Sequence, residues 1–275
     1  MDFKNANELL TLCKEQNISI SEVMRNREII TGECPAKEAD QKMARVLEIM
    51  KEAARSPIEK PIRSMGGLIG GEAQKLAQHS ASGQGLCGEL LEKAITYAMA
   101  TLETNASMGL IVASPTAGSA GIVPGLLLAF QEVYHFSDKE IQQVLFNAGA
   151  VGGCQAEVGV ASAMAASAAV ELMGGTPKQC LDAASTVLMN MLGLVCDPVG
   201  GLVEYPCQNR NAAGVANALI AAEMSLAGIS QLIPFDEMLE AMYKVGKRLP
   251  VELRETALSG CATTPSACEA CHIHA

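Results

Sequence analysis

Apolar residues recur at helical spacing through the first sixty residues of the chain. The segments NELLTLCKEQ, SEVMRNREII and ADQKMARVLEIMKEAA all show this spacing. Positions three and four residues apart lie on one face of a helix, so these segments predict amphipathic helices. Ser19 followed by Glu22 is a capping-box pattern, which marks the start of one of them. We expect residues 1–58 to form an N-terminal amphipathic helical region.

Beyond residue 58, glycine-rich turns alternate with apolar helical runs. Further helix starts are predicted at Ser137, at Thr176 before Pro177, and at Pro234. No sustained alternation of apolar and polar residues indicates strands, so the pattern predicts an all-α fold. No repeat or low-complexity linker divides the chain, and we expect one domain over residues 1–275, with its core and a cysteine-bearing tail in residues 59–275.

Composition indicates how this core is built. Hydrophobic residues make up 49% of the chain, aromatic residues only 3%, and tryptophan is absent. The Ala- and Gly-rich segments VGVASAMAASAAVELMGG and NAAGVANALIAAEMSLAG leave little side chain between neighbouring helices. We therefore predict a compact bundle of close-packed helices, with glycine-rich loops converging on one buried site.

Charge and terminal sequence narrow the function classes. The formal net charge of −10 gives no basis for binding nucleic acid or an anionic membrane surface, both of which attract basic patches. The longest uncharged stretch, residues 104–131, contains two prolines and four glycines and is not expected to span a membrane. The first residues lack the pattern of a secretory signal, which predicts a cytoplasmic protein.

The ten cysteines fall into distinct groups. In a reducing compartment they are expected to be buried thiols or metal ligands, not disulfides. Isolated cysteines usually act as small buried hydrophobic residues, and the sequence shows four of these: Cys13, Cys34, Cys87 and Cys180. Three others lie beside Gly or Pro at predicted helix boundaries: Cys154, Cys196 and Cys207. Their long separations match no compact metal motif, so spacing alone does not assign them a metal.

Several long motifs supply a family resemblance. GGCQAEVG, CDPVGGLVEYPCQNRNAAGVANA, NASMGLIVASPTAGSAGIVPG and SMGGLIGGEAQKL together resemble the α chain of the iron–sulfur L-serine dehydratases. The resemblance implies an all-helical catalytic domain, a 4Fe–4S cluster on Cys154, Cys196 and Cys207, and no pyridoxal phosphate. It also implies conversion of L-serine into pyruvate and ammonia, together with a separate β chain as partner. With three thiolates, one iron keeps an open position for a substrate oxygen.

Candidate substrate contacts lie in and near these motifs. The loop SPTAGSAG offers hydroxyl and N–H donors suited to a carboxylate, from Ser114, Thr116, Gly118 and Ser119, although a tight helix–helix turn explains it equally well. Asn105 and Arg210 are further candidates, and Arg210 fits a buried structural ion pair as readily. The SMGGLIGGE segment lacks the preceding strand and Lys-Ser/Thr pair of a phosphate loop and is expected to form a backbone wall of the same pocket.

The residue that removes the Cα proton is not identified by the sequence. The candidates are His79, His135, Ser64, Lys75, Glu103 and Glu157. Lone histidines in helical contexts are more often surface or structural groups than catalysts, and the others are candidates only because they lie near the motifs.

The C-terminal sequence GCATTPSACEACHIHA contains Cys268, Cys271 and His272 in the spacing of covalent haem attachment. That attachment occurs outside the cytosol, which makes it a poor fit here. The same residues are compatible with a thiol cap on the open iron, a flexible tail with exposed thiols, or adventitious zinc on the two cysteines with His272 and His274. The roles of Cys261, Cys268 and Cys271 stay open.

Two other functions compete with serine dehydration. Cysteine desulfidases resemble this family and would eliminate sulfide on the same scaffold. A noncatalytic iron–sulfur protein that senses oxygen or carries electrons is the alternative from another class. A cluster with an open iron favours substrate binding, and SPTAGSAGIVPG fits the serine enzymes better.

Overall fold

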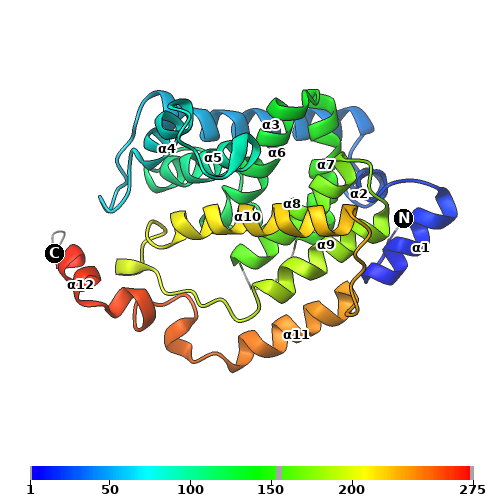
Figure 1. Ribbon diagram of the computed structural model, residues 1–275. Coiled ribbons are helices and arrows are strands. Elements are labelled where there is room, and N and C mark those ends of the chain that lie inside the picture. Colours follow the sequence, from blue (N-terminus) through cyan, green and yellow to red (C-terminus); the bar gives the residue numbers. More distant parts are fainter. Residues whose placement is uncertain (1, 153–156, 273–275) are drawn as a thin grey trace.

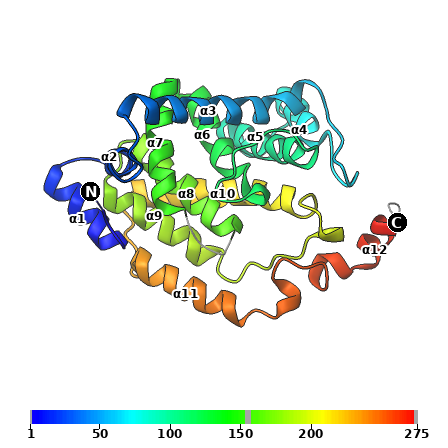
Figure 2. The same ribbon diagram turned by 180° about the vertical axis from the view of Figure 1, so that it is seen from behind.

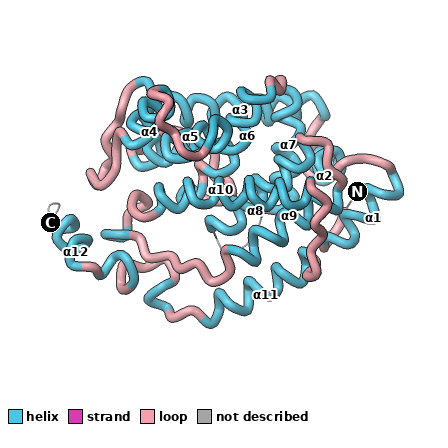
Figure 3. Tube along the Cα trace, in the orientation of Figure 1, coloured by secondary structure: helices cyan, strands magenta, loops and turns pink. Residues whose placement is uncertain are grey.

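The computed structural model describes residues 2–152 and 157–272 of the chain. Within these residues the chain is helical, with no strand and one isolated β-bridge (Figures 1 and 3). The α-helices are α1 (Ala6–Gln16), α2 (Ile20–Thr31), α3 (Ala36–Glu59), α4 (Glu72–Ala81), α5 (Gly88–Ala106), α6 (Ile122–Tyr134), α7 (Asp138–Val151), α8 (Glu157–Leu172), α9 (Pro177–Asn190), α10 (Cys207–Leu226), α11 (Phe235–Arg248) and α12 (Pro265–His272). Short 3-10 helices are η1 (Ala117–Ser119), η2 (Val199–Gly201), η3 (Val251–Leu253) and η4 (Gly260–Thr263).

The predicted helix starts are confirmed. Ser19, Ser137 and Thr176 each cap a helix, and in each case the Glu or Gln three residues later bonds back to the cap, which completes a capping box. Pro234 precedes α11 as expected. These local signals lie within one helical turn, which explains why they could be predicted from the sequence.

Helix α8 lies at the centre of the molecule, between α6, α7, α9 and α10 (Figure 1). Every residue from Val158 to Val170 is buried. Because α8 is surrounded, its side chains are small or aliphatic on all faces and form no single apolar stripe. The predicted compact bundle of Ala- and Gly-rich helices is confirmed for the described residues.

Glycines allow neighbouring helices to approach closely. A Cβ on Gly121 would overlap the Ala98 carbonyl oxygen of α5, and one on Gly125 would lie 2.8 Å from the Ala94 carbonyl oxygen. A Cβ on Gly214 of α10 would lie 2.6 Å from Oγ of Ser162 on α8. Since no larger side chain fits without moving backbone or a buried side chain, these glycines set the spacing of α5, α6, α8 and α10.

The chain from α11 onward forms an edge of the molecule away from α3 (Figures 1 and 2). Helix α11 runs along this edge, and η3, η4 and α12 continue to the C-terminal end, opposite the N-terminus. Helix α12 and η4 both pack on η2. Among the described helices, none is long and apolar enough to cross a membrane.

Candidate functional site

The segment between α9 and α10 carries two of the three candidate cluster ligands. Cys196 lies in its extended part, and Cys207 is the first residue of α10. Between them, Gly200 and Gly201 adopt φ of 64° and 71°, which glycine allows without strain. A hydrogen bond of 2.9 Å from Val199 N to Tyr205 O closes this turn. The free N–H groups at the start of α10 favour a negative group beside Cys207.

The isolated β-bridge joins Cys196 to a distant segment. Cys196 N donates to Leu253 O at 2.9 Å, and Glu255 N donates to Cys196 O at 2.9 Å. The bridge therefore holds residues 253–255, which comprise the last residue of η3 and the two that follow it, beside the thiol. No local sequence signal predicts this pairing, because its two sides are nearly sixty residues apart.

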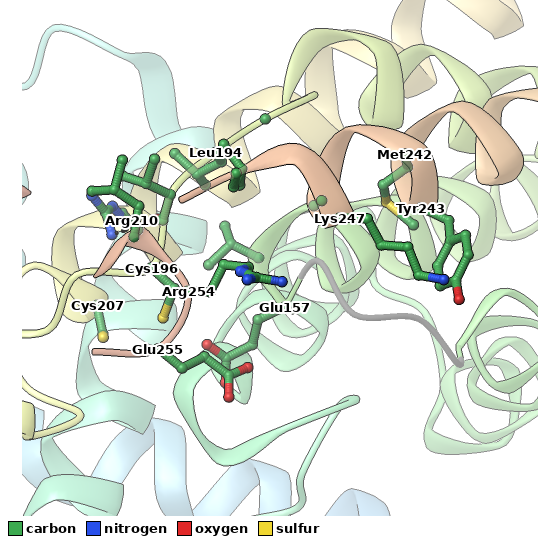
Figure 4. Close-up of a pocket in the computed structure, with 17 residues that line it drawn as sticks. Glu157, Leu194, Cys196, Cys207, Arg210, Met242, Tyr243, Lys247, Arg254 and Glu255 are labelled. Carbon is green, nitrogen blue, oxygen red and sulfur yellow. Dashed lines mark hydrogen bonds between the residues drawn. The ribbon is translucent and has the colours of Figure 1, made fainter. Parts of the chain in front are cut away.

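Both cysteines line a cavity of about 350 Å³ between α8, α11 and these two segments (Figure 4). The charged residues of its wall are Glu157, Arg210, Lys247, Arg254 and Glu255. The remaining lining residues are Val158, Gly159, Gly193, Leu194, Val195, Met242, Tyr243, Gly246, Leu249 and Leu253. The cavity thus combines two thiols with charges of both signs.

The two thiols lie close enough to affect each other electrostatically. Burial, then Cys196 and Glu157, raise the pKa of Cys207 to about 12. Burial also raises the pKa of Cys196, with Glu157 and Glu255 adding to the effect. Arg210 opposes the rise in both cases. The protein alone therefore keeps these thiols protonated, and a bound metal centre would supply the positive charge that two neighbouring thiolates need.

The donor set fits a cluster as far as the described residues extend. The half-buried Cys196 and the buried Cys207 line one cavity, and Cys207 begins a helix, whose first N–H groups favour a negative group beside it. The third predicted ligand, Cys154, lies outside the described residues, and those residues contain no group of three or more His, Cys, Asp or Glu side chains placed to hold a metal ion. The convergence of three cysteines on a cluster stays a prediction.

Arg210 combines both roles that the sequence left open. It lines the cavity and forms an ion pair of 2.7 Å with the buried Asp197, and it also donates to Val195 O at 3.0 Å. Burial opposes ionisation of Asp197, but the N–H of Cys261 and the Arg210 guanidinium hold the pKa of that carboxyl below its usual range. Arg210 is thereby fixed beside both cysteines by charge-assisted bonds.

The SPTAGSAG loop reaches the cavity through Glu157. The Thr116 hydroxyl donates to Oε1 of Glu157, and Oγ of Ser119 lies 3.0 Å from the Thr116 hydroxyl. A Cβ on Gly118 would lie 2.6 Å from the same Glu157 oxygen, so glycine allows this approach. The loop therefore contacts a cavity residue, although none of its own residues is part of the wall.

Asn211 ties this loop to Cys207. Its side-chain amide donates to Gly118 O at 2.7 Å and to Cys207 O at 2.9 Å, and its carbonyl oxygen accepts from Gly121 N at 3.1 Å. The side chain is fully buried. One asparagine thus fixes the loop relative to the start of α10.

Other predicted contacts lie away from the cavity. Asn105 is near the end of α5 and does not line it. Ser114 is buried, and its Oγ has no hydrogen-bond partner among the described residues. The SMGGLIGGE segment, which was predicted to form a backbone wall of the pocket, folds around the buried Glu204 instead. Glu204 accepts hydrogen bonds from Ser64 Oγ at 2.6 Å, Gly66 N at 2.6 Å and Leu68 N at 3.0 Å. This segment thus stabilises the loop before Cys207 and is not part of the cavity wall.

Of the candidates for the base, only Glu157 lines the cavity. His79, His135, Ser64 and Lys75 lie elsewhere. Glu103 is fully buried and accepts from Ala73 N at 2.9 Å and Gln208 Nε2 at 3.2 Å, and burial raises its pKa. The structure thus reduces the list to one residue next to the thiols.

The C-terminal tail forms the helix α12, whereas the sequence left open a flexible tail. Cys271 is half-buried, with its Sγ 3.1 Å from the position of a Cβ on Gly200. Cys261 N donates to Asp197 Oδ2 at 2.5 Å, whereas Cys268 is exposed. The side chain of His272 and the whole of His274 lie outside the described part of the chain. The tail therefore packs on the loop between the two cysteines.

Sequence reasoning did not single out Lys247, Arg254 and Glu255. They belong to α11 and to the segment after η3, and no motif includes them. Only the fold places them in the cavity wall, since the bridge to Cys196 and the packing of α11 are both long-range contacts.

Taken together, the helical bundle and its cavity define an all-α protein with a thiol-bearing, charged pocket suited to a metal centre and a small polar ligand. Comparison with known proteins is more specific. The chain matches the family model described as serine dehydratase alpha chain over residues 15–262. The chain belongs to this family.

The names of individual relatives agree with this family assignment. The chain is 48% identical over 278 residues to the probable L-serine dehydratase, alpha chain, of Bacillus subtilis, and the alignment covers 96% of this chain and 92% of the relative. It is 44% identical to the L-serine dehydratase, alpha chain, of Peptoniphilus asaccharolyticus, over 94% of this chain and 93% of that one. It is 34% identical to an L-serine dehydratase of Helicobacter pylori, over 96% of this chain but only 62% of the longer relative.

Proposed function

We propose that this chain is the catalytic α subunit of an L-serine dehydratase, a lyase that converts L-serine into pyruvate and ammonia. Membership of the serine dehydratase alpha-chain family, with relatives of that name aligned over almost the full chain, carries the proposal. The cavity supports it, since it places two predicted cluster ligands beside charged groups that suit an amino acid.

The proposed cofactor is a 4Fe–4S cluster held by Cys154, Cys196 and Cys207. When bound, it supplies a Lewis-acid iron with an open position, which makes the β-hydroxyl of serine a better leaving group. Arg210, fixed by Asp197, contributes positive charge beside two of the ligands. Asn211 holds the start of α10 in register with the SPTAGSAG loop.

Glu157 is the proposed acceptor of the Cα proton. The Thr116 hydroxyl donates to its Oε1, which orients the carboxylate and leaves Oε2 to take the proton. Ser119 is within hydrogen-bond distance of the Thr116 hydroxyl and supports the same arrangement. In this reading Thr116, Gly118 and Ser119 position the base, whereas the sequence indicated that they bind the substrate carboxylate directly.

A separate β chain is the proposed partner, and the cytoplasm the proposed location. The relatives named alpha chain are covered at 92% or more, whereas the longer L-serine dehydratase of Helicobacter pylori extends well beyond this chain. The name alpha chain, which the family and these relatives share, supports a β chain as partner.

The function is tested by pyruvate release from L-serine. The protein is purified anaerobically, reconstituted with iron and sulfide, and assayed alone and with its β chain, before and after exposure to air. We expect pyruvate formation that air abolishes. An intact cluster and partner without pyruvate would contradict the proposal, and sulfide release from L-cysteine under the same conditions would indicate the desulfidase alternative.

A further inference from the structure

Arg254 and Glu255 are charged residues of the cavity wall that the mechanism above leaves without a role. We propose that the two residues recognise the substrate as an L-α-amino acid zwitterion, with the Arg254 guanidinium binding its carboxylate and the Glu255 carboxylate binding its ammonium group. The inference rests on the proposed function and adds to it the groups that select the substrate.

The backbone fixes both residues beside the reacting centre. The bridge between Cys196 and residues 253–255 consists of two hydrogen bonds of 2.9 Å each. Any movement of this segment would break bonds to a predicted cluster ligand. The backbone of both residues is therefore held in register with Cys196, although both residues are exposed.

Glu255 has an unusual backbone conformation. Its φ is +61°, in the left-handed region that non-glycine residues rarely adopt and that costs free energy. Glycine would adopt this conformation without strain. A glutamate at such a position, with its carboxylate near enough to Cys196 to affect the thiol, indicates that the side chain itself is needed there.

The cations of the cavity wall differ in their existing contacts. Arg210 is paired with Asp197 at 2.7 Å, and Lys247 Nζ lies 4.2 Å from the centre of the Tyr243 ring. Arg254 forms no ion pair with another described residue. A guanidinium can bind a carboxylate through two parallel N–H bonds, so Arg254 is the cation best placed for the substrate carboxylate.

The two carboxylates of the cavity wall, Glu157 and Glu255, differ in their contacts and are assigned different roles. Glu157 is engaged by Thr116 and lies at the start of α8, whereas Glu255 comes from the segment after η3 and makes no ion pair with a described residue. Figure 4 shows the two carboxylates lying near each other. A zwitterion placed between Arg254 and Glu255 would meet complementary charge at both ends. Its β-hydroxyl and Cα proton could then turn toward Cys196, Cys207 and Glu157.

The test pairs each residue with the ligand group that it binds. Arg254→Gln and Glu255→Gln are compared with wild type in the complete, cluster-loaded enzyme. The ligands are L-serine, 3-hydroxypropanoate, which lacks the ammonium group, and 2-aminoethanol, which lacks the carboxylate. KM is measured for L-serine and inhibition constants for the other two.

We expect Arg254→Gln to raise the KM for L-serine and the inhibition constant of 3-hydroxypropanoate roughly ten- to hundredfold, as for loss of a charged hydrogen bond. The inhibition constant of 2-aminoethanol should stay within about twofold of the wild-type value. Glu255→Gln should weaken the binding of L-serine and 2-aminoethanol by a similar factor and leave the binding of 3-hydroxypropanoate unchanged. The effect should lie mainly in KM, because the reacting groups are untouched. Equal weakening of all three ligands, or of none, by either variant would overturn the assignment.

Matched controls separate recognition from structure. Arg248→Gln and Glu252→Gln change exposed neighbours that do not line the cavity, and should leave all three constants unchanged. Glu255→Gly relieves the backbone and removes the carboxylate, so it should lose L-serine affinity to the same extent as Glu255→Gln. If Glu255→Gly instead keeps wild-type KM, only the backbone conformation matters and the role of the carboxylate is refuted.

The outcome is separable from that of the proposed function. Wild-type enzyme that releases no pyruvate would refute serine dehydration, whereas calorimetric binding of the three ligands to wild type and variants would still test the charge pairing. Wild-type turnover together with unselective variants would refute the pairing alone.

Discussion

The helical core around α8 and the cavity beside it are held together by different means. In the core, the close approach of neighbouring helices is made possible by Gly121, Gly125 and Gly214, and packed aliphatic side chains fill the remaining space. The cavity wall combines apolar residues with five charged ones, and the charged residues are positioned by backbone hydrogen bonds and a few buried polar side chains. The residues that specify the fold are thus largely distinct from those that carry the chemistry, and variants should affect one without the other.

The largest effect is expected for the cysteines of the cavity. Cys196→Ala and Cys207→Ala should each prevent cluster assembly and lower pyruvate release by more than about 100-fold, since even residues that only support metal ligands contribute 10–100-fold. Iron and sulfide content and pyruvate release measure the effect, and unfolding should stay cooperative. Cys87→Ala, at an exposed position, is the control. Cys154→Ala should behave like the first two, and a full cluster in any of the three would refute the ligand assignment.

The next largest loss of activity is expected for Glu157→Gln. The amide keeps an oxygen for the Thr116 hydroxyl but cannot accept the Cα proton, so kcat should fall about 10²–10⁴-fold, as for loss of a general base. Exchange of the serine Cα proton with deuterated solvent should be lost while cluster content is unchanged. Glu223→Gln, exposed on α10, is the control. Wild-type exchange in Glu157→Gln would assign the base elsewhere.

A substitution in the core should act through stability. Gly121→Ala places a methyl group against the Ala98 carbonyl oxygen and should destabilise the fold by about 3 kcal/mol, the upper range for overpacking. Gly149→Ala in α7 adds the same methyl group where no described atom lies within 4 Å, and should stabilise the helix by about 0.5–1 kcal/mol. Denaturant unfolding of both variants measures the difference. Equal stabilities would refute the close-approach role of Gly121.

These contrasts explain what the sequence could predict. Capping boxes at Ser19, Ser137 and Thr176 and the small-residue pattern of α8 and α10 are local features, and the helices that they predict are present. The cysteine positions were recognised through family motifs, and two of them do line one cavity. Which polar residues surround them depends on tertiary contacts, so Arg254 and Glu255 were missed.

The glycine-rich motifs illustrate the same limit. SPTAGSAG and SMGGLIGGE were both predicted to approach the site, but the first reaches it only through Glu157, and the second surrounds Glu204. Their composition indicates tight backbone packing without saying which carboxylate they pack against. Long-range hydrogen bonds decide this, and residue type alone does not encode them.

Glu204→Gln tests the region where the core and the cavity meet. The carboxylate accepts three hydrogen bonds from residues 64–68, and an amide would direct its own N–H group at one of those donors. We expect a loss of about 1–3 kcal/mol, as for an unsatisfied buried polar group. Limited proteolysis within residues 60–71 should accelerate, and kcat should change less than for Glu157→Gln. Unchanged stability would show that the segment does not depend on this carboxylate.

The smallest effect is expected at Glu132, on the side of the core away from the cavity. Burial opposes ionisation of its carboxyl, but bonds from Tyr97 at 2.7 Å, Lys93 at 3.2 Å and Arg55 at 2.9 Å lower the pKa below its ordinary value. Because the folded-state pKa is depressed, its stabilisation is present above the unfolded value of 4.5 and is lost as pH falls through the folded value. Glu132→Gln should therefore cost about 1 kcal/mol at pH 7. The difference from wild type should shrink below pH 4.5, and urea unfolding at pH 7 and pH 4 measures it. A difference that grows on acidification would contradict the assigned shift, whereas unchanged serine turnover at pH 7 would confirm that this part of the core is independent of the cavity.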